Sequence, residues 1–268
     1  MSPQFVCLSG LPRSGSTMLS SILNQNPLIY SEGNSAVCQL LWDMYLSSTK
    51  HVSEQLGANN RHTTPYDLIS HIPKIYYKNV PDTKKIIIDK CRSWTLSYNV
   101  DLLKEYVDPT IKIIVLERSI TDIFKSFMKL YKKNNINDAE IHTRLATMLV
   151  PNSEPILRSL VGVNMARKQN EENQSSTKTK NFLFIKYDDL IQNTEVVMNQ
   201  IYDFCGWEPY KHDFNNIVNQ YPENDDFYGL KGFHEIRQTV CKEENKIVLP
   251  PDILAKCQSI DKIVGYNS

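Results

Sequence analysis

The residues best suited to chemistry form a glycine-rich loop near the start of the chain, Gly10-Leu11-Pro12-Arg13-Ser14-Gly15-Ser16-Thr17. A β-branched run precedes this loop and a segment with helical spacing follows it. In that setting the backbone amides of the loop and the start of the helix can hold a phosphate. The glycines at 10 and 15 let the backbone turn tightly and approach the anion closely. The pattern predicts an anion site whose cation is Arg13.

The loop has the spacing of an ATP-hydrolysing phosphate loop except at one position, where Ser16 replaces the usual lysine. That lysine normally reaches the β- and γ-phosphates of a triphosphate. Here the positive charge stands three places earlier, at Arg13. A phosphate loop with its cation displaced suits a nucleotide with a single 5′-phosphate that carries a leaving group.

A second candidate site follows the apolar run Lys112–Glu117, where Arg118 comes directly after the run and Ser126 lies eight residues later. A residue directly after a buried strand lies at the carboxyl edge of the sheet, where open α/β folds bind ligands. Arginine suits phosphate because it can donate two parallel hydrogen bonds. Alone this signal is weak, but beside the first loop it favours a second anion site.

These sites need a sheet edge and helices to position them. Short β-branched runs predict strands, and each is followed by a segment with helical spacing. Apolar strands that alternate with helices indicate an α/β fold, P-loop-like, with three layers and a central mostly parallel sheet. We expect one domain over residues 1–268. The strands are predicted at Gln4–Ser9, Lys85–Asp89, Lys112–Glu117 and Asn181–Lys186, and the helices include Thr17–Asn24, Thr121–Tyr131, Glu195–Phe204 and Pro251–Val264. The polar run Asn170–Lys180 is predicted to be an exposed loop.

Composition excludes several classes of partner. The 30 basic and 30 acidic residues give no net charge, so no chain-wide field attracts nucleic acid. Six cysteines without C-x-x-C spacing predict no metal site. We also expect no signal peptide, no transmembrane helix and no membrane association, hence a cytoplasmic location.

With these motifs in hand, the chain resembles the sulfotransferase family. Leu8–Thr17 looks like that family's 5′-phosphosulfate-binding loop, in the version found in tyrosylprotein and many bacterial sulfotransferases. The resemblance implies 3′-phosphoadenosine-5′-phosphosulfate (PAPS) as the sulfuryl donor and PAP as the product. The loop from Ser14 to Thr17, with Arg13, would hold the 5′ end. Arg118 and Ser126 would hold the 3′-phosphate, although Ser119 stands where the family usually has Asp.

The resemblance also implies catalytic residues. Glu32 follows an Asn-Pro turn, as the catalytic base does in the tyrosylprotein branch. Lys90 matches the family lysine that stabilises the leaving oxygen, although Arg92 stands where proline is usual. His234 is the alternative base, because the cytosolic branch uses a histidine.

Two further resemblances concern the nucleotide. Tyr187, in Tyr-Asp-Asp-Leu after a predicted strand, would approach it. Lys231 and Gly232 look like the Lys-Gly pair with which the cytosolic branch clamps the 3′-phosphate, and Arg237 is a further candidate. The acceptor would be a hydroxyl, or an amine, on a small molecule, carbohydrate or peptide.

Two other functions remain open at this point. One is a small-molecule kinase with a degenerate phosphate loop, which would need Mg²⁺ and ATP. The absent loop lysine argues against it. The other is a non-catalytic nucleotide-binding protein on the same scaffold, against which the presence of both Glu32 and Lys90 argues.

Overall fold

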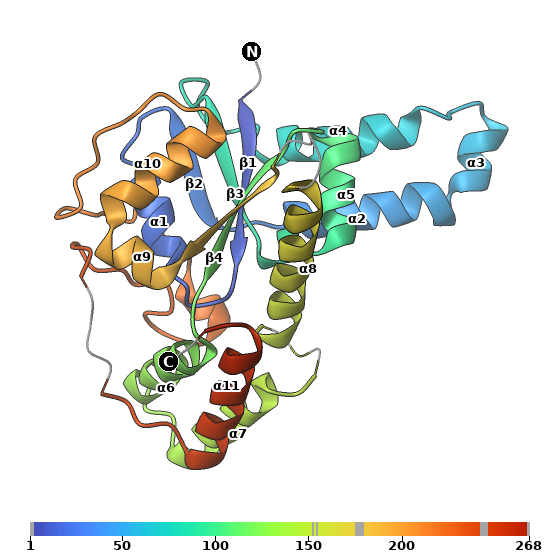
Figure 1. The fold of residues 1–268 in the computed structure, drawn as a ribbon. Helices are drawn as coiled ribbons and strands as arrows, with labels where there is room; N and C mark the ends of the chain where they lie inside the picture. The colour runs from blue at the N-terminus through green and yellow to red at the C-terminus, as the bar shows by residue number, and fades with distance from the viewer. Residues whose placement is uncertain (1–2, 152, 154, 175–179, 242–245, 267–268) are drawn as a thin grey trace.

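The structure is a computed structural model that describes residues 3–151, 153, 155–174, 180–241 and 246–266. Its central sheet has five strands in the order β2-β3-β1-β4-β5, and every neighbouring pair is parallel (Figure 1). The predicted α/β class with a parallel sheet is confirmed. The strands are β1 Gln4–Gly10, β2 Ile29–Asn34, β3 Ile86–Lys90, β4 Lys112–Glu117 and β5 Phe182–Lys186.

Helices surround the sheet, and the predicted ones lie within about two residues of their expected bounds. They are α1 Ser16–Leu23, α2 Val37–Leu46, α3 Ser53–Ala58, α4 Thr64–Tyr76, α5 Ser97–Tyr106, α6 Ile120–Lys133, α7 Asp138–Met148, α8 Leu157–Gln174, α9 Tyr187–Gln192, α10 Thr194–Cys205 and α11 Pro251–Ile263. A π turn covers Ser47–His51, and 3₁₀ turns cover Arg92–Thr95 and Asp225–Tyr228.

The strands are buried on both faces because their apolar side chains alternate between two cores. In β1, Val6 and Leu8 join the core under α1, α9 and α10, whereas Cys7 points to the core under α2, α5 and α8. Helices α6, α7 and α11 gather beyond the carboxyl ends of the strands (Figure 1). The carboxyl ends of the central strands therefore lie between α6 and α1.

Two local expectations were incomplete or wrong. Strand β2 was not predicted, because it is an edge strand whose last four residues, Ser31-Glu32-Gly33-Asn34, lack a continuous apolar run. The loop predicted at Asn170–Lys180 is wrong in its first part, since α8 continues to Gln174. Residues 175–179 lie outside the described part of the chain.

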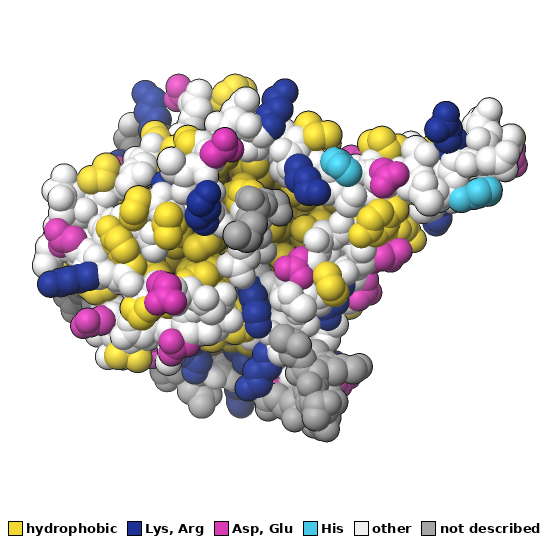
Figure 2. Space-filling model, turned by 90° about the horizontal axis from the view of Figure 1, so that it is seen from above, with side chains coloured by type: hydrophobic (Ala, Val, Ile, Leu, Met, Phe, Trp, Pro, Cys, Tyr) yellow, Lys and Arg dark blue, Asp and Glu magenta, His cyan; other side chains and the backbone are white. Residues whose placement is uncertain are grey.

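The amino edge of the sheet differs from the carboxyl edge. A cavity of about 1060 Å³ opens there, lined by Phe5, Tyr66, Tyr106 and Lys85 among others. Figure 2 views the molecule from this side, and basic and acidic side chains are interspersed around a hydrophobic centre. Among the coloured side chains of this view, Lys and Arg are separated by acidic, hydrophobic and other side chains.

Candidate functional site

The loop between β1 and α1 takes its shape from two glycines. Gly10 has a φ of 125°, and a Cβ there would collide with the backbone of Leu116 on β4. Gly15 has a φ of 91° and precedes α1, whose first turn has no side-chain cap. Among the described residues no N-cap side chain takes the first amides of α1, so these amides could bind an anion.

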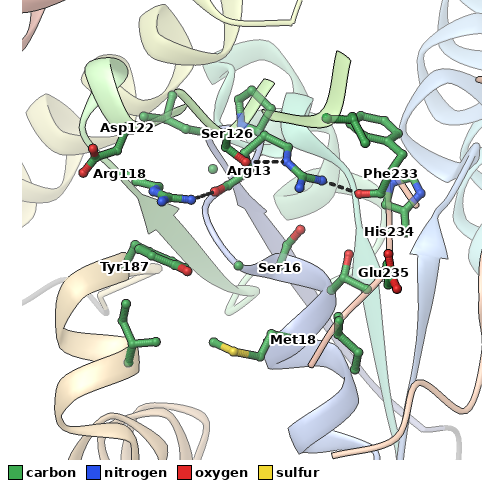
Figure 3. Close-up of a pocket in the computed structure, with 18 of the residues that line it drawn as sticks. Arg13, Ser16, Met18, Arg118, Asp122, Ser126, Tyr187, Phe233, His234 and Glu235 are labelled. Carbon is green, nitrogen blue, oxygen red and sulfur yellow. Dashed lines mark hydrogen bonds between the residues drawn. The ribbon is translucent and has the colours of Figure 1, made fainter. Parts of the chain in front are cut away.

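A cavity of about 790 Å³ lies at the carboxyl edge of the sheet, between this loop, α6, α9 and residues 232–241 (Figure 3). Most of the predicted site residues line it. They are Arg13, Gly15, Ser16, Thr17, Lys90, Arg118, Ser126, Tyr187 and Gly232. Segments more than 200 residues apart in the sequence thus meet at one site.

Three predicted residues do not line this cavity. Ser14 is buried behind the loop, where its Oγ donates to the carbonyl of Leu11. Lys231 is exposed, and its backbone forms hydrogen bonds to the side chain of Asn134. Glu32 lies on β2, and its Oε2 accepts a hydrogen bond from the hydroxyl of Tyr30 at 2.7 Å.

Sheet register explains the second anion site. Glu117, the last residue of β4, pairs with Lys186, the last residue of β5, so Arg118 and Tyr187 leave the sheet side by side. The guanidinium of Arg118 lies 3.9 Å from the centroid of the Tyr187 ring, a cation–π contact. Its Nη1 donates to the carbonyl of Arg13 at 2.8 Å. Its buried Nε has no partner among the described residues, so one donor is left for a ligand oxygen.

Arg13 connects three parts of the site. Its Nε donates to Ser126 Oγ at 3.1 Å, and its Nη1 donates to the carbonyl of Phe233 (Figure 3). Burial, and then the nearby Arg118, lower the pKa of Arg13 to about 10. Two half-buried guanidinium groups close together form an environment that an anion would stabilise.

Lys90 ends β3 and is only 5% exposed, and its Nζ lies 3.1 Å from Glu223 Oε2. Burial lowers the pKa of Lys90, and Glu223 opposes that shift. Glu223 also accepts from the amide of Asn34 at 3.1 Å, and its Oε2 lies 3.4 Å from His234 Nε2. Burial would raise the pKa of Glu223, but Lys90, Asn34 and His234 outweigh it, so that pKa is lowered.

Glu223 can reach Lys90 because position 33 is glycine: a Cβ there would collide with the Glu223 side chain. His234 is fixed from its other side, where Nδ1 lies 2.7 Å from Asp225 Oδ1. The sequence reading missed Glu223 and Asp225. Both lie in a polar, irregular segment with no periodic signal.

The described residues include neither a cluster suited to a metal ion nor a helix suited to a membrane. No group of three or more His, Cys, Asp or Glu residues is arranged to hold a metal ion within the described ranges. In the same part of the chain, no helix combines the length and the apolar character needed to cross a bilayer.

Comparisons with known proteins give one matching family model and several similar solved structures. A model of the "Sulfotransferase family" matches residues 4–212. No curated protein sequence matches the chain. Among solved structures, the chain resembles the sulfotransferase domain of the Synechococcus PCC 7002 olefin synthase, at 17% identity and a TM-score of 0.57, covering 100% of this chain and 96% of that one. The chain also resembles the sulfotransferase domain from the curacin biosynthetic pathway, at 17% identity and a TM-score of 0.54, covering 100% of this chain and 99% of that one. A third similar structure is a sulfotransferase from Alicyclobacillus acidocaldarius, at 10% identity and a TM-score of 0.53, covering 100% of this chain and 98% of that one.

Proposed function

Since the chain belongs to the sulfotransferase family, we propose that it transfers a sulfuryl group from PAPS to a hydroxyl or amine acceptor and releases PAP. The observation that carries this proposal is the meeting of Arg13, Arg118 and Lys90 at one cavity beside an uncapped helix N-terminus. That set offers two anion sites and a separate cation between strand ends. A donor with a 5′-phosphosulfate and a 3′-phosphate needs those same elements.

The two anion sites have different parts in holding the donor. The amides at the start of α1, with Ser16 and Thr17, would bind the 5′-phosphosulfate. Arg118 and Ser126 would bind the 3′-phosphate, and Arg13 lies between the two sites. The Tyr187 ring packs against the Arg118 guanidinium and contributes an aromatic face to the cavity. Gly232, with a φ of 76°, lets residues 232–241 turn across the opening, and Lys231 adds positive charge nearby.

Lys90 would act on the leaving group. The acceptor oxygen or nitrogen forms a bond to sulfur while the bond from sulfur to the bridging phosphate oxygen breaks. That oxygen gains the electron pair, and the Lys90 ammonium donates a hydrogen bond to it. In the structure the same ammonium pairs with Glu223, so the leaving oxygen would share or replace that contact.

Two residues are candidates for the base that takes the acceptor's proton. Glu32 is a candidate because of the sequence resemblance. It lies on β2 and does not line the cavity. His234 lines the cavity beside Lys90, and Asp225 orients its ring. Burial lowers the pKa of His234.

Replacing each candidate separately by glutamine distinguishes them. Loss of the base should lower kcat by about 100-fold or more and leave PAP affinity unchanged. If His234 is the base, wild-type activity should fall with falling pH only below about 6.5, because the neutral ring is the active form. Unchanged turnover in both variants would remove both residues as bases.

The donor is tested by calorimetric titration with PAP, run beside ATP plus Mg²⁺. We expect metal-independent PAP binding that is much tighter than ATP binding. Preference for Mg-ATP would instead support a kinase. PAP binding without turnover of PAPS on a broad panel of phenols, alcohols, sugars and amines would support a non-catalytic nucleotide-binding protein.

A further inference from the structure

The first turn of helix α6 is capped by a carboxylate from helix α11, near the C-terminus of the chain. Asp261 on α11 is 2% exposed, and its Oδ1 accepts from the amide of Ile120 at 2.6 Å. Its Oδ2 accepts from the amide of Thr121 at 3.0 Å and from Ser119 Oγ at 2.8 Å. A buried carboxylate is costly unless donors surround it, and the start of a helix supplies both donors and a favourable dipole.

The position of α6 matters because this helix forms one wall of the cavity. Arg118 immediately precedes the capped turn, and Ser126 lies two turns further along. Whatever fixes residues 119–121 therefore fixes where the Arg118 side chain begins. The two side chains proposed to hold the 3′-phosphate both depend on this one helix.

Apolar packing also attaches α11 to α6. Ile253 and Cys257 of α11 are fully buried, in the same core as Ile123, Phe124 and Phe127 of α6. The three hydrogen bonds of Asp261 are directional, so they also fix the conformation of the first turn of α6. A change at Asp261 should therefore alter the geometry of α6 more than the attachment of α11.

The carboxylate also decides how an anion can bind here. The amides of Ile120 and Thr121 are occupied, and the Asp261 charge would repel a phosphate from them. A phosphate is left with the side chains of Arg118 and Ser126. Asp261 itself does not line the cavity, so its only route to a ligand's position by contact is through α6.

We propose that Asp261 is a positioning residue for the donor's 3′-phosphate: it holds the first turn of α6 so that Arg118 and Ser126 meet that group. The proposal rests on the proposed function, since it assumes a nucleotide with a 3′-phosphate. It predicts an effect that is specific to one end of the ligand. PAP and AMP differ only in the 3′-phosphate, and together they read out that specificity.

The test is Asp261→Asn, with calorimetric affinities for PAP and AMP and a thermal melt. Asparagine keeps the shape of the side chain but leaves one acceptor oxygen for three donors. We expect PAP affinity to fall by about five- to tenfold and AMP affinity to change by less than about twofold. Asp252→Asn is the matched control, because Asp252 lies on the same helix but is exposed and pairs with His142. It should change neither affinity.

A second variant separates positioning from general support. Ser119→Asp, added to Asp261→Asn, supplies a capping carboxylate from α6 itself and should restore PAP affinity to within about twofold of wild type. Three results would each overturn the proposal. The first is a lower melting temperature with both affinities unchanged, and the second is an equal loss of PAP and AMP affinity. The third is a loss of PAP affinity that Ser119→Asp does not restore. If the wild-type protein itself does not prefer PAP to AMP, the proposed donor and this inference fail together. A wild-type preference for PAP that Asp261→Asn leaves unchanged overturns the inference alone.

Discussion

Two helices begin at the cavity, and their first turns are built in opposite ways. Helix α1 starts after Gly15, and no side chain caps it in the described part of the chain. Helix α6 starts after Ser119, whose Oγ accepts from the amide of Asp122, while Asp261 takes the amides of Ile120 and Thr121. One N-terminus leaves its donors to a ligand, and the other has used them within the protein.

The difference shows that one nucleotide can be held by two kinds of anion site. At α1 the donors belong to the backbone, so the requirement falls on glycines that let the chain turn. At α6 the donors must be side chains, so the requirement falls on Arg118 and Ser126. Substitutions at the two helices should therefore affect opposite ends of the same ligand.

The largest effect is expected from Gly15→Ala. Gly15 has a φ of 91°, and a Cβ there would lie 3.1 Å from the Tyr187 ring. Strain of about 1–3 kcal/mol would move the amides that follow, so affinity for both AMP and PAP should fall, by on the order of 100-fold. Calorimetry with the two nucleotides measures the effect.

Gly206→Ala is the control for that variant. Gly206 also has a positive φ, of 70°, but a Cβ there meets no atom within 4 Å. It should lower the melting temperature slightly and leave both affinities unchanged. If Gly15→Ala behaves in the same way, the α1 amides do not bind the ligand.

A smaller and more selective effect is expected from Arg118→Ala. A hydrogen bond to a charged group contributes about 1.5–3 kcal/mol, and a loss in the lower part of that range should reduce PAP affinity by about 10- to 50-fold. AMP affinity should fall far less, and only because Arg118 also holds the carbonyl of Arg13. The ratio of the PAP loss to the AMP loss is the decisive quantity.

Lys125→Ala is the matched control for Arg118→Ala. Lys125 lines the same wall but is paired with Asp122 at 3.7 Å. It should change PAP affinity by less than about threefold. Equal losses of PAP and AMP in Arg118→Ala would mean that the two helices do not divide the ligand between them.

The contrast also explains how much the sequence could predict. The α1 site is local: strand, glycines and helix follow one another within twenty residues, Gln4 to Leu23, so a pattern reveals it. Arg118 and Tyr187 could be anticipated for a related reason. Each directly follows a buried strand, and neighbouring parallel strands end at the same edge.

The remaining parts of the site depend on contacts between distant segments. Asp261 lies 140 residues beyond Thr121, and Glu223 lies 133 residues beyond Lys90. Neither carboxylate belongs to a motif, and no hydrophobic period positions residues 215–241. The edge strand β2, and therefore the surroundings of Glu32, were missed because its outer half is polar. That residues 1–268 form a single domain stays a prediction.

The smallest effect is expected at Glu223, which pairs with Lys90 and so lies beside the proposed leaving oxygen. Its carboxylate places a negative charge 3.1 Å from Lys90, at the end of the cavity where the sulfuryl group would lie. Glu223→Gln keeps the shape and the contact with the Asn34 amide but removes the charge. Affinity for adenosine 5′-phosphosulfate should therefore rise by about two- to fivefold at low salt, since one repulsive charge in a partly buried site is removed.

The same variant should change AMP affinity less, because AMP brings its 5′-phosphate to Lys90 but has no sulfate beyond it. It should also leave the ratio of PAP to AMP affinity unchanged, because that ratio is set at α6. Gly33→Ala gives an independent check: its Cβ would displace the Glu223 side chain without altering any charge on the protein. Both variants should then favour the sulfate-bearing nucleotide. A uniform rise for all three nucleotides would instead mean that Glu223 acts through the general field of the cavity, and that the sulfuryl end is not a separate third region beside the two helices.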